Sequence, residues 1–394
     1  MHVVFVSHEY PPYIFGGIGT FVESLARELG RMGVTTTVIC GYPKPSPPKQ
    51  ENMGDMEDEA VKITRLPYLN VPLSRHTMFQ VFNLRRIRDI VRDTKADVVH
   101  GQAGCIFPST IVIRSLAPVV VTFHGSAKAN KANASRSLTR GGSWGDFWTS
   151  LVGYPAWNYI YEKELQHADA AVAVSSSLQS DILRETGGEY GEKLCTIRSG
   201  VDINQLDHRY GRFEDTPENH DTVLFAGRLV WAKGALDLVR IAALLRDKRM
   251  KLIIHGTGPL LGRVGRNVKE LALENVEIKD FSYDEMMKSM KRSSFVVLPS
   301  RYEACPMAIL EAMCLGKVPV MYKLPYAREL TENGEYGILA TDPGDMVTKI
   351  NGLLEAGDVE VVQSKIRAHA REQFDGEKTA REYLRLYEEL SGRK

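Results

Sequence analysis

The most informative part of the amino-acid sequence is the stretch of residues 299–316, which reads PSRYEACPMAILEAMCLG. The apolar run from Phe295 to Leu298 precedes it and is typical of a buried strand, which Pro299 and Ser300 end. A helix is expected to begin near Pro306, because proline at a first helical position has no amide hydrogen to leave unbonded. The residues that follow are nearly all apolar. We therefore predict a buried strand and a buried helix in succession, the repeating unit of an α/β protein.

Two glutamates interrupt this apolar stretch. Glu311 lies inside the predicted helix, and a buried carboxylate is costly unless a basic group or the hydroxyls of a ligand accompany it. Glu303 precedes the helix, whose first amides, near Met307 and Ala308, favour a bound anion. A sugar nucleotide fits this arrangement, with its phosphates at the helix start and its hydroxyls on the carboxylates. The alternative is a core helix in which Glu311 pairs with Arg or Lys and Glu303 is solvated.

The spacing of Glu303 and Glu311, between a Pro-Ser strand end and a Glu-Ala-Met helix, resembles the paired-glutamate motif of retaining GT-B glycosyltransferases. The wider sequence is most similar to glycosyltransferase family four. That resemblance implies two Rossmann-like domains with parallel sheets facing across a cleft. It also implies a retaining hexosyltransferase of carbohydrate biosynthesis, which moves a sugar from a nucleoside diphosphate sugar to a hydroxyl acceptor. In the family, the first glutamate contacts the transferred sugar and the second holds the ribose.

Length and composition are those of a globular protein with more than one domain. The chain has 394 residues, more than one hydrophobic core usually covers. Its 43% hydrophobic and 25% charged residues are ordinary values, and a net charge of +1 gives no indication of nucleic-acid binding.

Cysteine usage and hydropathy predict a cytoplasmic protein. The five cysteines are scattered and odd in number, so we expect buried thiols in a reducing compartment. No apolar run approaches the ~20 residues of a membrane span, and the N-terminus is predicted to be a strand rather than a signal peptide.

Strand and helix patterns alternate along the chain, which predicts parallel sheets. The predicted strands are Val3 to Val6, Val34 to Cys40, Val61 to Leu66, Val98 to His100, Val119 to Phe123, Asp169 to Val174, Lys193 to Ile197, Thr222 to Phe225, Leu252 to His255, Val276 to Ile278, Phe295 to Leu298 and Val318 to Met321. The predicted helices include Phe21 to Met32, Met78 to Val91, Phe107 to Leu116, Leu178 to Arg184, Leu236 to Leu245 and Glu377 to Leu390.

We place an N-terminal, acceptor-side domain at residues 1–203 and a nucleotide-sugar-binding domain at residues 204–376. The last helix, within 377–394, is assigned to the first domain, because it crosses back in GT-B proteins. The polar residues 203–221 are predicted to be an interdomain linker and residues 41–60 a solvated loop.

Two features of the first domain are candidates for ligand contact. Gly16, Gly17 and Gly19 lie between the first strand and the first helix, where glycines let backbone amides approach a ligand. A tight turn would explain them equally, but family four places such a turn against the donor phosphates and the acceptor. His124 follows a central strand and is expected at the ligand-binding edge of the sheet. The family often has a histidine there that meets the donor sugar, whereas the residue alone is explained as well by a ring that caps a turn.

A third feature of the first domain is the segment 126–161. Its first part, residues 126–145, carries Lys128, Lys131, Arg136 and Arg140 and no acidic residue, and aromatic residues follow closely from Trp144 to Tyr161. It is predicted to be a mobile acceptor-binding or peripheral membrane element, or else a solvated loop before an aromatic-rich helix.

In the second domain, Arg228 and Lys233 follow a strand and form the outline of a diphosphate clamp. Their spacing resembles the donor-phosphate element of family four, and Gly256 lies in a turn that the family places beside the nucleotide. The chain departs from the family pattern at Ser199, where asparagine is usual. It departs again at 324–326, Leu-Pro-Tyr, where a Gly-Gly pair is common.

No Asp-x-Asp sequence occurs, so we expect no metal and no cofactor, and protein cations must neutralise the donor phosphates. Glu303, His124, Arg228 and Lys233 are the catalytic candidates. Three alternatives remain open at this point: a sugar-nucleotide epimerase, a phosphorylase-like enzyme that needs pyridoxal phosphate, and a non-catalytic protein that binds nucleotide sugars.

Overall fold

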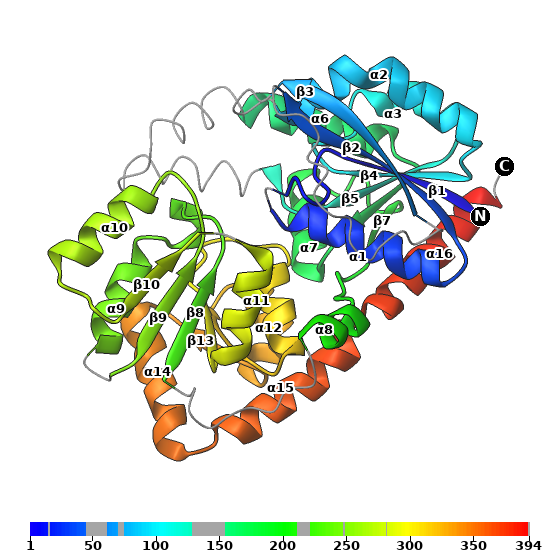
Figure 1. Ribbon diagram of the computed structural model, residues 1–394. Helices are drawn as coiled ribbons and strands as arrows, with labels where there is room; N and C mark the ends of the chain where they lie inside the picture. The colour runs from blue at the N-terminus through cyan, green and yellow to red at the C-terminus, as the bar shows by residue number, and fades with distance from the viewer. Residues whose placement is uncertain are drawn as a thin grey trace. The chain divides into compact units, whose positions relative to one another are not determined.

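The structure is a computed structural model that describes residues 1–14, 16–44, 61–69, 75–127, 154–210, 221–246, 249–280 and 282–392. These residues form two compact units (Figure 1). The first contains the described residues up to 127, residues 154–202 and residues 376–392; the second contains the described part of 203–375. Each unit is built around a parallel sheet.

The sheet of the first unit has seven strands in the order β3-β2-β1-β4-β5-β6-β7, all paired in parallel. This is the order of a Rossmann-like sheet, in which the chain reverses direction across the sheet between β1 and β4. The strands are β1 His2–Ser7, β2 Thr35–Lys44, β3 Val61–Leu69, β4 Val98–Gln102, β5 Val119–Phe123, β6 Ala170–Ala173 and β7 Leu194–Thr196. The helices are α1 Gly17–Arg31, α2 Arg75–Thr94, α3 Ser109–Ile113, α6 Tyr154–His167, α7 Ser176–Glu185 and α16 Gly376–Ser391.

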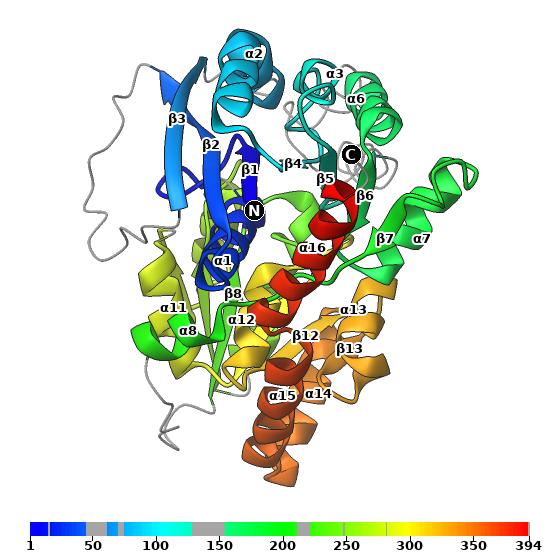
Figure 2. The ribbon, with the colours of Figure 1, turned by 90° about the vertical axis from the view of Figure 1, so that its right-hand side faces the viewer.

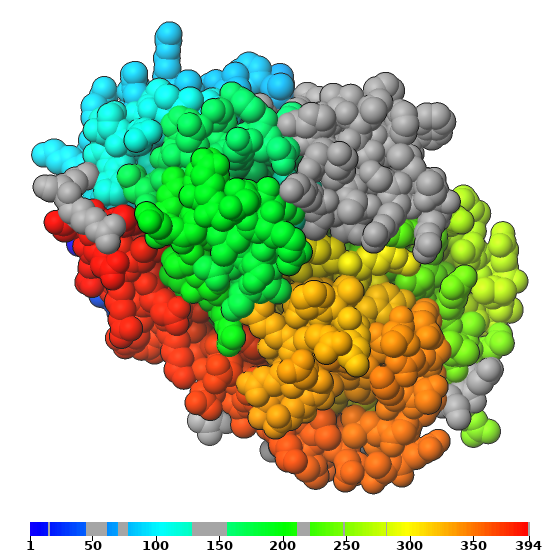
Figure 3. All heavy atoms as spheres, turned by 180° about the vertical axis from the view of Figure 1, so that it is seen from behind, coloured from blue at the N-terminus to red at the C-terminus, as the bar shows by residue number. Residues whose placement is uncertain are grey.

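The last helix, α16, completes the core of this first unit although it comes from the far end of the chain (Figures 1 and 2). It packs against α1, and its Tyr383 and Tyr387 are fully buried in the same core cluster as Phe5 and Val98. The Tyr387 hydroxyl lies 2.6 Å from Nδ1 of His100 on β4. The outer side of α16 forms part of the molecular surface (red in Figure 3).

The second unit repeats the same topology with six strands. Its order is β10-β9-β8-β11-β12-β13, so the reversal falls between β8 and β11. The strands are β8 Thr222–Ala226, β9 Lys251–His255, β10 Val276–Lys279, β11 Phe295–Leu298, β12 Val318–Tyr322 and β13 Ile338–Ala340. The helices are α8 Ile203–Tyr210, η3 Trp231–Lys233, α9 Asp237–Arg246, α10 Leu261–Glu270, α11 Tyr283–Arg292, α12 Met307–Cys314, α13 Pro325–Leu330, η4 Glu332–Gly334, α14 Pro343–Ala356 and α15 Val359–Gln373.

The predicted α/β class with two Rossmann-like parallel sheets is confirmed. Every strand predicted from the sequence is present. Most of them are short apolar runs such as Val3 to Val6 and Phe295 to Leu298, which suit strands that helices cover on both faces. The predicted helix after Pro306 begins at Met307, and residues 309–314 are buried.

Two sequence predictions need correction, and one departure from the family pattern has a structural explanation. Residues 203–210 are not linker but the helix α8, whose apolar Leu206 and Tyr210 are buried. The predicted loop 41–60 is wrong for residues 41–44, since β2 continues through them and pairs with β3 as far as Leu69. The Leu-Pro-Tyr segment at 324–326 is the start of α13, with proline at its first position. Residues 45–60 lie outside the described residues.

The described part of the chain contains no helix that is long and apolar enough to cross a membrane. All five cysteines are free thiols. Cys40, Cys105 and Cys314 are buried as predicted, whereas Cys195 and Cys305 are half-buried.

Candidate functional site

The loops that follow β8 and β11 meet at the point where the strand order of the second unit reverses. In open parallel sheets, ligands bind outside the carboxyl ends of the strands at such a point. Lys233 ends the short helix after β8, and Glu303 lies in the loop after β11. The Lys233 Nζ forms an ion pair with the Glu303 carboxylate, and Ser300 donates a hydrogen bond of 2.8 Å to the same oxygen. Glu303 is therefore not the solvated group of the alternative interpretation.

A glycine allows these two loops to touch. Gly234, directly after Lys233, has a φ of +72°, and a Cβ atom there would lie 2.2 Å from the Pro299 carbonyl oxygen. Any side chain at this position would therefore separate the loops.

Arg301 ties the same two loops together. Its backbone N–H donates to the Ala232 carbonyl at 2.8 Å, and its guanidinium donates to the Trp231 carbonyl and to the Asp237 carboxylate, both at 2.8 Å. The guanidinium also lies over the Trp231 ring, 4.3 Å from its centroid. Backbone and side-chain bonds to both loops fix the positions of Lys233 and Glu303 relative to each other.

Glu311 is buried on α12, with only 3% of its surface exposed. Its partner is the hydroxyl of Tyr283, which donates a hydrogen bond of 2.7 Å. Among the described residues, no Arg or Lys pairs with it, so that alternative is wrong. Burial raises the pKa of the Glu311 carboxyl to about 7, although the Tyr283 hydrogen bond acts in the opposite direction.

The remaining donor candidates of this unit lie in the same two loops as the Lys233–Glu303 pair or at the start of the helix that follows them. Met307 and Ala308 begin α12, where the first amides have no acceptor within the helix, and Pro306 offers no side-chain cap. Arg228 follows β8 and is exposed, and its guanidinium has no hydrogen-bond or ion-pair partner among the described residues. These groups could bind an anion.

Gly256 has a structural explanation that the sequence did not provide. A Cβ atom at this position would lie 2.1 Å from the carbonyl oxygen of Gly227, the residue before Arg228. Glycine is therefore needed so that the turn after β9 can pack against the loop that carries Arg228.

In the first unit, Gly16 and His124 lie at the carboxyl edge of their own sheet. The Gly16 N–H donates a hydrogen bond of 2.9 Å to the carboxylate of Glu9, which is 5% exposed. Glu9 therefore adds a partner at Gly16 that the sequence analysis did not consider. The Gly16 amide already has an anionic partner, while α1 begins at Gly17, and Gly19 packs against Glu9 and Ile14.

His124 is held by Gln102 and Phe21. Its Nε2 lies 2.7 Å from the Gln102 side-chain oxygen, so that nitrogen is the protonated donor and Nδ1 is left as an acceptor. The Phe21 ring meets the imidazole edge to face at 5.0 Å between centroids. Burial lowers the pKa of His124 to about 4, so the ring is neutral at pH 7.

Sequence reasoning missed the groups that support the predicted ones. Tyr283, Ser300 and Arg301 in the second unit and Glu9 and Gln102 in the first were given no role. Only Glu9, in a polar segment directly after the first strand, had a local signal that could have singled it out. The others are recognisable only by their contacts.

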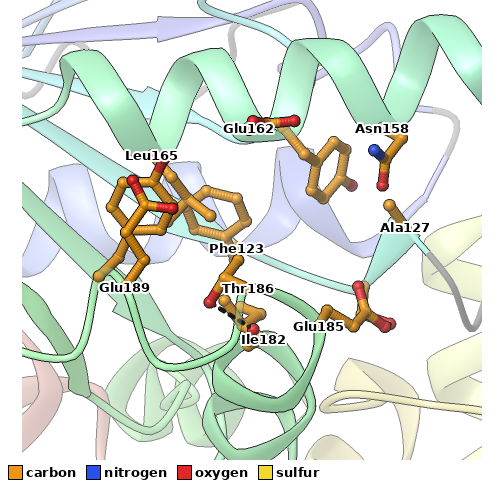
Figure 4. Close-up of a pocket in the computed structure, with 12 residues that line it drawn as sticks. Phe123, Ala127, Asn158, Glu162, Leu165, Ile182, Glu185, Thr186 and Glu189 are labelled. Carbon is orange, nitrogen blue, oxygen red and sulfur yellow. Dashed lines mark hydrogen bonds between the residues drawn. The ribbon is translucent and has the colours of Figure 1, made fainter.

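The first unit also contains a pocket of about 250 Å³ between α6 and α7 (Figure 4). Three glutamates, Glu162, Glu185 and Glu189, line it together with tyrosine rings, and Ser126 donates a hydrogen bond of 2.6 Å to Glu185. None of the predicted catalytic or donor-binding residues lines this pocket, but four of its lining residues belong to the predicted acceptor-binding segment 126–161: Ser126, Ala127, Asn158 and Tyr161. Most of the predicted segment 126–161, including its four basic residues, lies outside the described residues.

A search of the described residues finds no group of three or more His, Cys, Asp or Glu side chains that could hold a metal ion. The candidate groups of the second unit are the cations Arg228 and Lys233, the first amides of α12 and the carboxylates of Glu303 and Glu311. Glu303 is paired with a cation, whereas Glu311 is bonded to a phenol. This donor set suits a ligand that carries both phosphates and hydroxyls.

Two family models match the chain. Residues 15–205 match the model described as Glycosyltransferase Family 4, and residues 220–356 match the model described as Glycosyl transferases group 1. Both descriptions agree with the family whose motif the spacing of Glu303 and Glu311 resembles.

Curated relatives and solved structures match over nearly the full length. A glycogen synthase of Mycobacterium tuberculosis is 24% identical over 93% of this chain and 89% of its own. An uncharacterized glycosyltransferase of Methanocaldococcus jannaschii is 24% identical over 97% of both chains. The fold is similar to that of sucrose-phosphate synthase from Thermosynechococcus elongatus, with a TM-score of 0.77, 16% identity and coverage of 100% and 99%. It is also similar to that of Anabaena HepE in complex with UDP and glucose, with a TM-score of 0.70, 18% identity and coverage of 99% and 100%.

Proposed function

Because the chain belongs to the glycosyltransferases of family 4 and group 1 and has their GT-B fold, we propose that it moves a sugar from a nucleoside diphosphate sugar to a hydroxyl acceptor with retention of configuration. The observation that carries this proposal is the Lys233–Glu303 ion pair beside the start of α12. A cation, a carboxylate and free helix amides are the groups that a diphosphate joined to a sugar requires.

Charge development explains the roles of the cations. As the bond between the anomeric carbon and the diphosphate oxygen breaks, its electron pair leaves with the diphosphate, whose negative charge increases. Lys233, the exposed Arg228 and the first amides of α12 would stabilise that charge more strongly in the transition state than in the bound donor. The acceptor oxygen bonds to the anomeric carbon, and its proton passes to the departing diphosphate oxygen, which has gained the electron pair of the broken bond.

The two glutamates would bind the other two parts of the donor, the transferred sugar and the ribose. Glu303 pairs with Lys233 in the structure. When the sugar or the phosphate of the donor replaces part of that contact with Lys233, Glu303 would accept hydrogen bonds from the hydroxyls of the transferred sugar. Glu311, next to the Tyr283 hydroxyl, would accept hydrogen bonds from the ribose. Gly256 keeps the Arg228 loop in place by its close packing on Gly227.

Residues of the first unit would bind the acceptor. His124 presents an unprotonated Nδ1 that could accept a hydrogen bond from a sugar hydroxyl. Since Glu9 already occupies the Gly16 amide, a neutral hydroxyl is a better ligand for the Gly16–Gly17 turn than a phosphate is. The acceptor is a carbohydrate or another hydroxyl compound, and we expect the enzyme to act in the cytoplasm.

This reaction would need no metal and no cofactor apart from the donor, because protein cations would neutralise the diphosphate. We expect turnover to survive EDTA. Loss of turnover in EDTA that magnesium or manganese restores would contradict this expectation.

The proposal is tested by separating binding from transfer. A thermal-shift panel of nucleoside diphosphates and their sugars first identifies the donor, because a ligand that binds only the folded state raises its stability. Glu311→Gln should then weaken the nucleoside diphosphate and its sugar alike. A lost hydrogen bond to a charged group is worth roughly 1.5–3 kcal/mol, about ten- to a hundredfold in affinity.

Glu303→Gln should instead leave the affinity for the nucleoside diphosphate near that of the wild type, while transfer falls sharply, since the product lacks the sugar that Glu303 holds. Equal losses of product affinity in the two variants would show that these roles are wrongly assigned. Product analysis without an acceptor separates a transferase from an epimerase, which would convert the donor alone.

A further inference from the structure

One buried phenol of the second unit has no role in the reaction proposed above. Tyr326, near the start of α13, is 4% exposed, and its hydroxyl oxygen has no hydrogen-bond partner among the described residues. An unpaired polar group in a protein interior is destabilising, and most buried hydroxyls are bonded. Phenylalanine would fill the same space without this cost. The hydroxyl of Tyr326 therefore needs an explanation other than packing.

The sheet of the second unit brings Tyr326 close to Glu303. β11 and β12 are parallel neighbours in which Leu298 lies opposite Met321. Glu303 and Tyr326 each lie five residues beyond one of these two, in segments that leave the same edge of the sheet. Burial raises the pKa of the Tyr326 phenol well above its ordinary value, and the Glu303 carboxylate raises it further. The carboxylate thus acts electrostatically on the phenol although no hydrogen bond joins them.

Glu303 depends on a partner that the donor would take away. Its described bonds, from Lys233 and Ser300, both reach the same oxygen, Oε1, and its side chain is only 10% exposed. In the proposed reaction Lys233 turns to the diphosphate. A carboxylate in such a setting is strongly destabilised when it loses its cation, unless another donor takes the place of that cation.

We propose that Tyr326 is this second donor, whose hydroxyl bonds to the Glu303 carboxylate when the diphosphate of the donor engages Lys233. Tyr326 is then a positioning residue, because it holds the carboxylate that accepts the hydroxyls of the transferred sugar. A carboxylate accepts up to about four hydrogen bonds, so Ser300, Tyr326 and a sugar hydroxyl can bind it together. The inference rests on the proposed function only for the event that draws Lys233 away.

Burial favours Glu303 over the ligand as the acceptor of this hydrogen bond. The hydroxyl oxygen of Tyr326 is enclosed by the protein, so a bound sugar or phosphate does not reach it directly. Glu303 is itself nearly enclosed and changes its partner during the proposed reaction. The ring of Tyr326 can stay in place while the carboxylate turns toward it.

The first test needs no ligand, because Lys233→Ala removes the cation as the donor would. In the wild-type background, Tyr326→Phe should leave the free energy of unfolding unchanged or raise it, since the hydroxyl has no partner to lose. In the Lys233→Ala background, the same substitution should increase the unfolding equilibrium constant about tenfold, because it removes a hydrogen bond to a charged group. Urea unfolding of the four proteins measures this coupling. Equal effects of Tyr326→Phe in both backgrounds would overturn the proposal.

Tyr387→Phe is the matched control for this test. It removes the same hydroxyl from a buried ring of the first unit, but that hydroxyl is bonded to His100. We expect it to destabilise the protein equally with and without Lys233. This difference separates a hydroxyl that gains a partner from one that already has it.

The second test uses calorimetry with UDP, ADP and GDP. Tyr326→Phe should weaken the nucleoside diphosphate that binds by about tenfold, because the bound state loses the bond between Tyr326 and Glu303. In the Glu303→Ala background, Tyr326→Phe should have no effect on this affinity. The same weakening in both backgrounds would show that the hydroxyl binds the nucleotide itself and would contradict the proposal. If none of the three nucleotides binds while unfolding shows the coupling, the proposed function fails and the contact between Tyr326 and Glu303 stands.

Discussion

The two glutamates of the motif have different surroundings, although the sequence presents them as a pair. Glu303 has a cation and a hydroxyl beside it, while Glu311 has one phenol in a buried setting. The Lys233 ammonium and the Ser300 hydroxyl both bond to the same oxygen of Glu303. Glu311 instead carries a proton over part of the physiological pH range.

The first residue-scale prediction concerns Glu311 and pH. Its pKa in the folded chain is about 7, against an ordinary value of 4.5, so the native state binds the proton more tightly than the unfolded state. The stability that the group contributes is therefore complete below pH 4.5 and falls as the pH rises to about 7.

Glu311→Gln should remove this loss, so between pH 4.5 and 7.5 the wild type should lose up to roughly 3 kcal/mol relative to the variant. Urea unfolding of both proteins across that range measures the difference. Glu164, also buried with a pKa raised to about 7, acts equally in both proteins. Parallel pH profiles would contradict the prediction.

The second residue-scale prediction concerns Lys233. Lys233→Ala should reduce kcat more than it raises KM, because the charge it stabilises grows as the diphosphate leaves. Lys251→Ala is the control, since Lys251 forms an exposed pair with Glu277 in the same sheet and should leave kcat unchanged. If Lys233→Ala raised KM alone, Lys233 would only bind the donor.

At the scale of the elements, the site depends on contact between two loops that lie some 70 residues apart in sequence. β8 and β11 are adjacent in the sheet, so their following loops leave the same edge. Gly234 and Arg301 then hold the loops together through a left-handed backbone conformation and hydrogen bonds to both loops. The positions of Lys233 and Glu303 are properties of this joined structure.

The element-scale prediction is that Gly234→Ala breaks this junction. The new Cβ would lie 2.2 Å from a carbonyl oxygen and would also need a strained φ, so we expect a loss of at least about 2 kcal/mol together with most of the activity. Gly265→Ala on α10 is the matched control. No atom lies within 4 Å of the Cβ added there, and alanine should stabilise that helix by roughly 0.5–1 kcal/mol. Similar effects of the two substitutions would contradict the role of Gly234.

At the scale of the whole molecule, the first unit is formed from the two ends of the chain. Residues 376–392 supply α16, and its Tyr383 and Tyr387 fill the core beside β4 and β5. The Tyr387 and Tyr383 hydroxyls bond with His100 and Thr122, both fully buried, so the loss of either ring would also leave a polar group without its partner.

The molecule-scale prediction is that Tyr387→Ala destabilises the first unit selectively, by roughly 3–5 kcal/mol. Hydrogen–deuterium exchange should accelerate in β1, β4 and β5 but not in β8, β9 and β11. Val361→Ala, on the exposed side of α15, should change exchange in neither sheet. Equal acceleration in both sheets would show that the two units do not unfold independently.

The sequence by itself determined the α/β class and all the strands except β13, and it supplied the site residues that remain predictions. Continuous apolar runs encode buried parallel strands, and proline and glycine mark where those runs end in polar loops. Glu303 lies in such a loop, and Glu311 is the one charged residue of an apolar helix. These patterns depend only on residues that are close together in the sequence, so they can be recognised without the tertiary structure. The spacing of the glutamates then pointed to a family, which the family models confirm.

Only the tertiary structure decided which groups these residues meet. Tyr283 as the partner of Glu311 and Pro299 against Gly234 are contacts between segments far apart in sequence that the packed fold brings together. Glu9 on the Gly16 amide is a contact within one loop, and it depends on the conformation of that loop. The helix α8 was missed because its two buried residues are too few to show a period in a polar stretch. A side chain's charge and partner depend on burial, and burial is a property of the packed molecule.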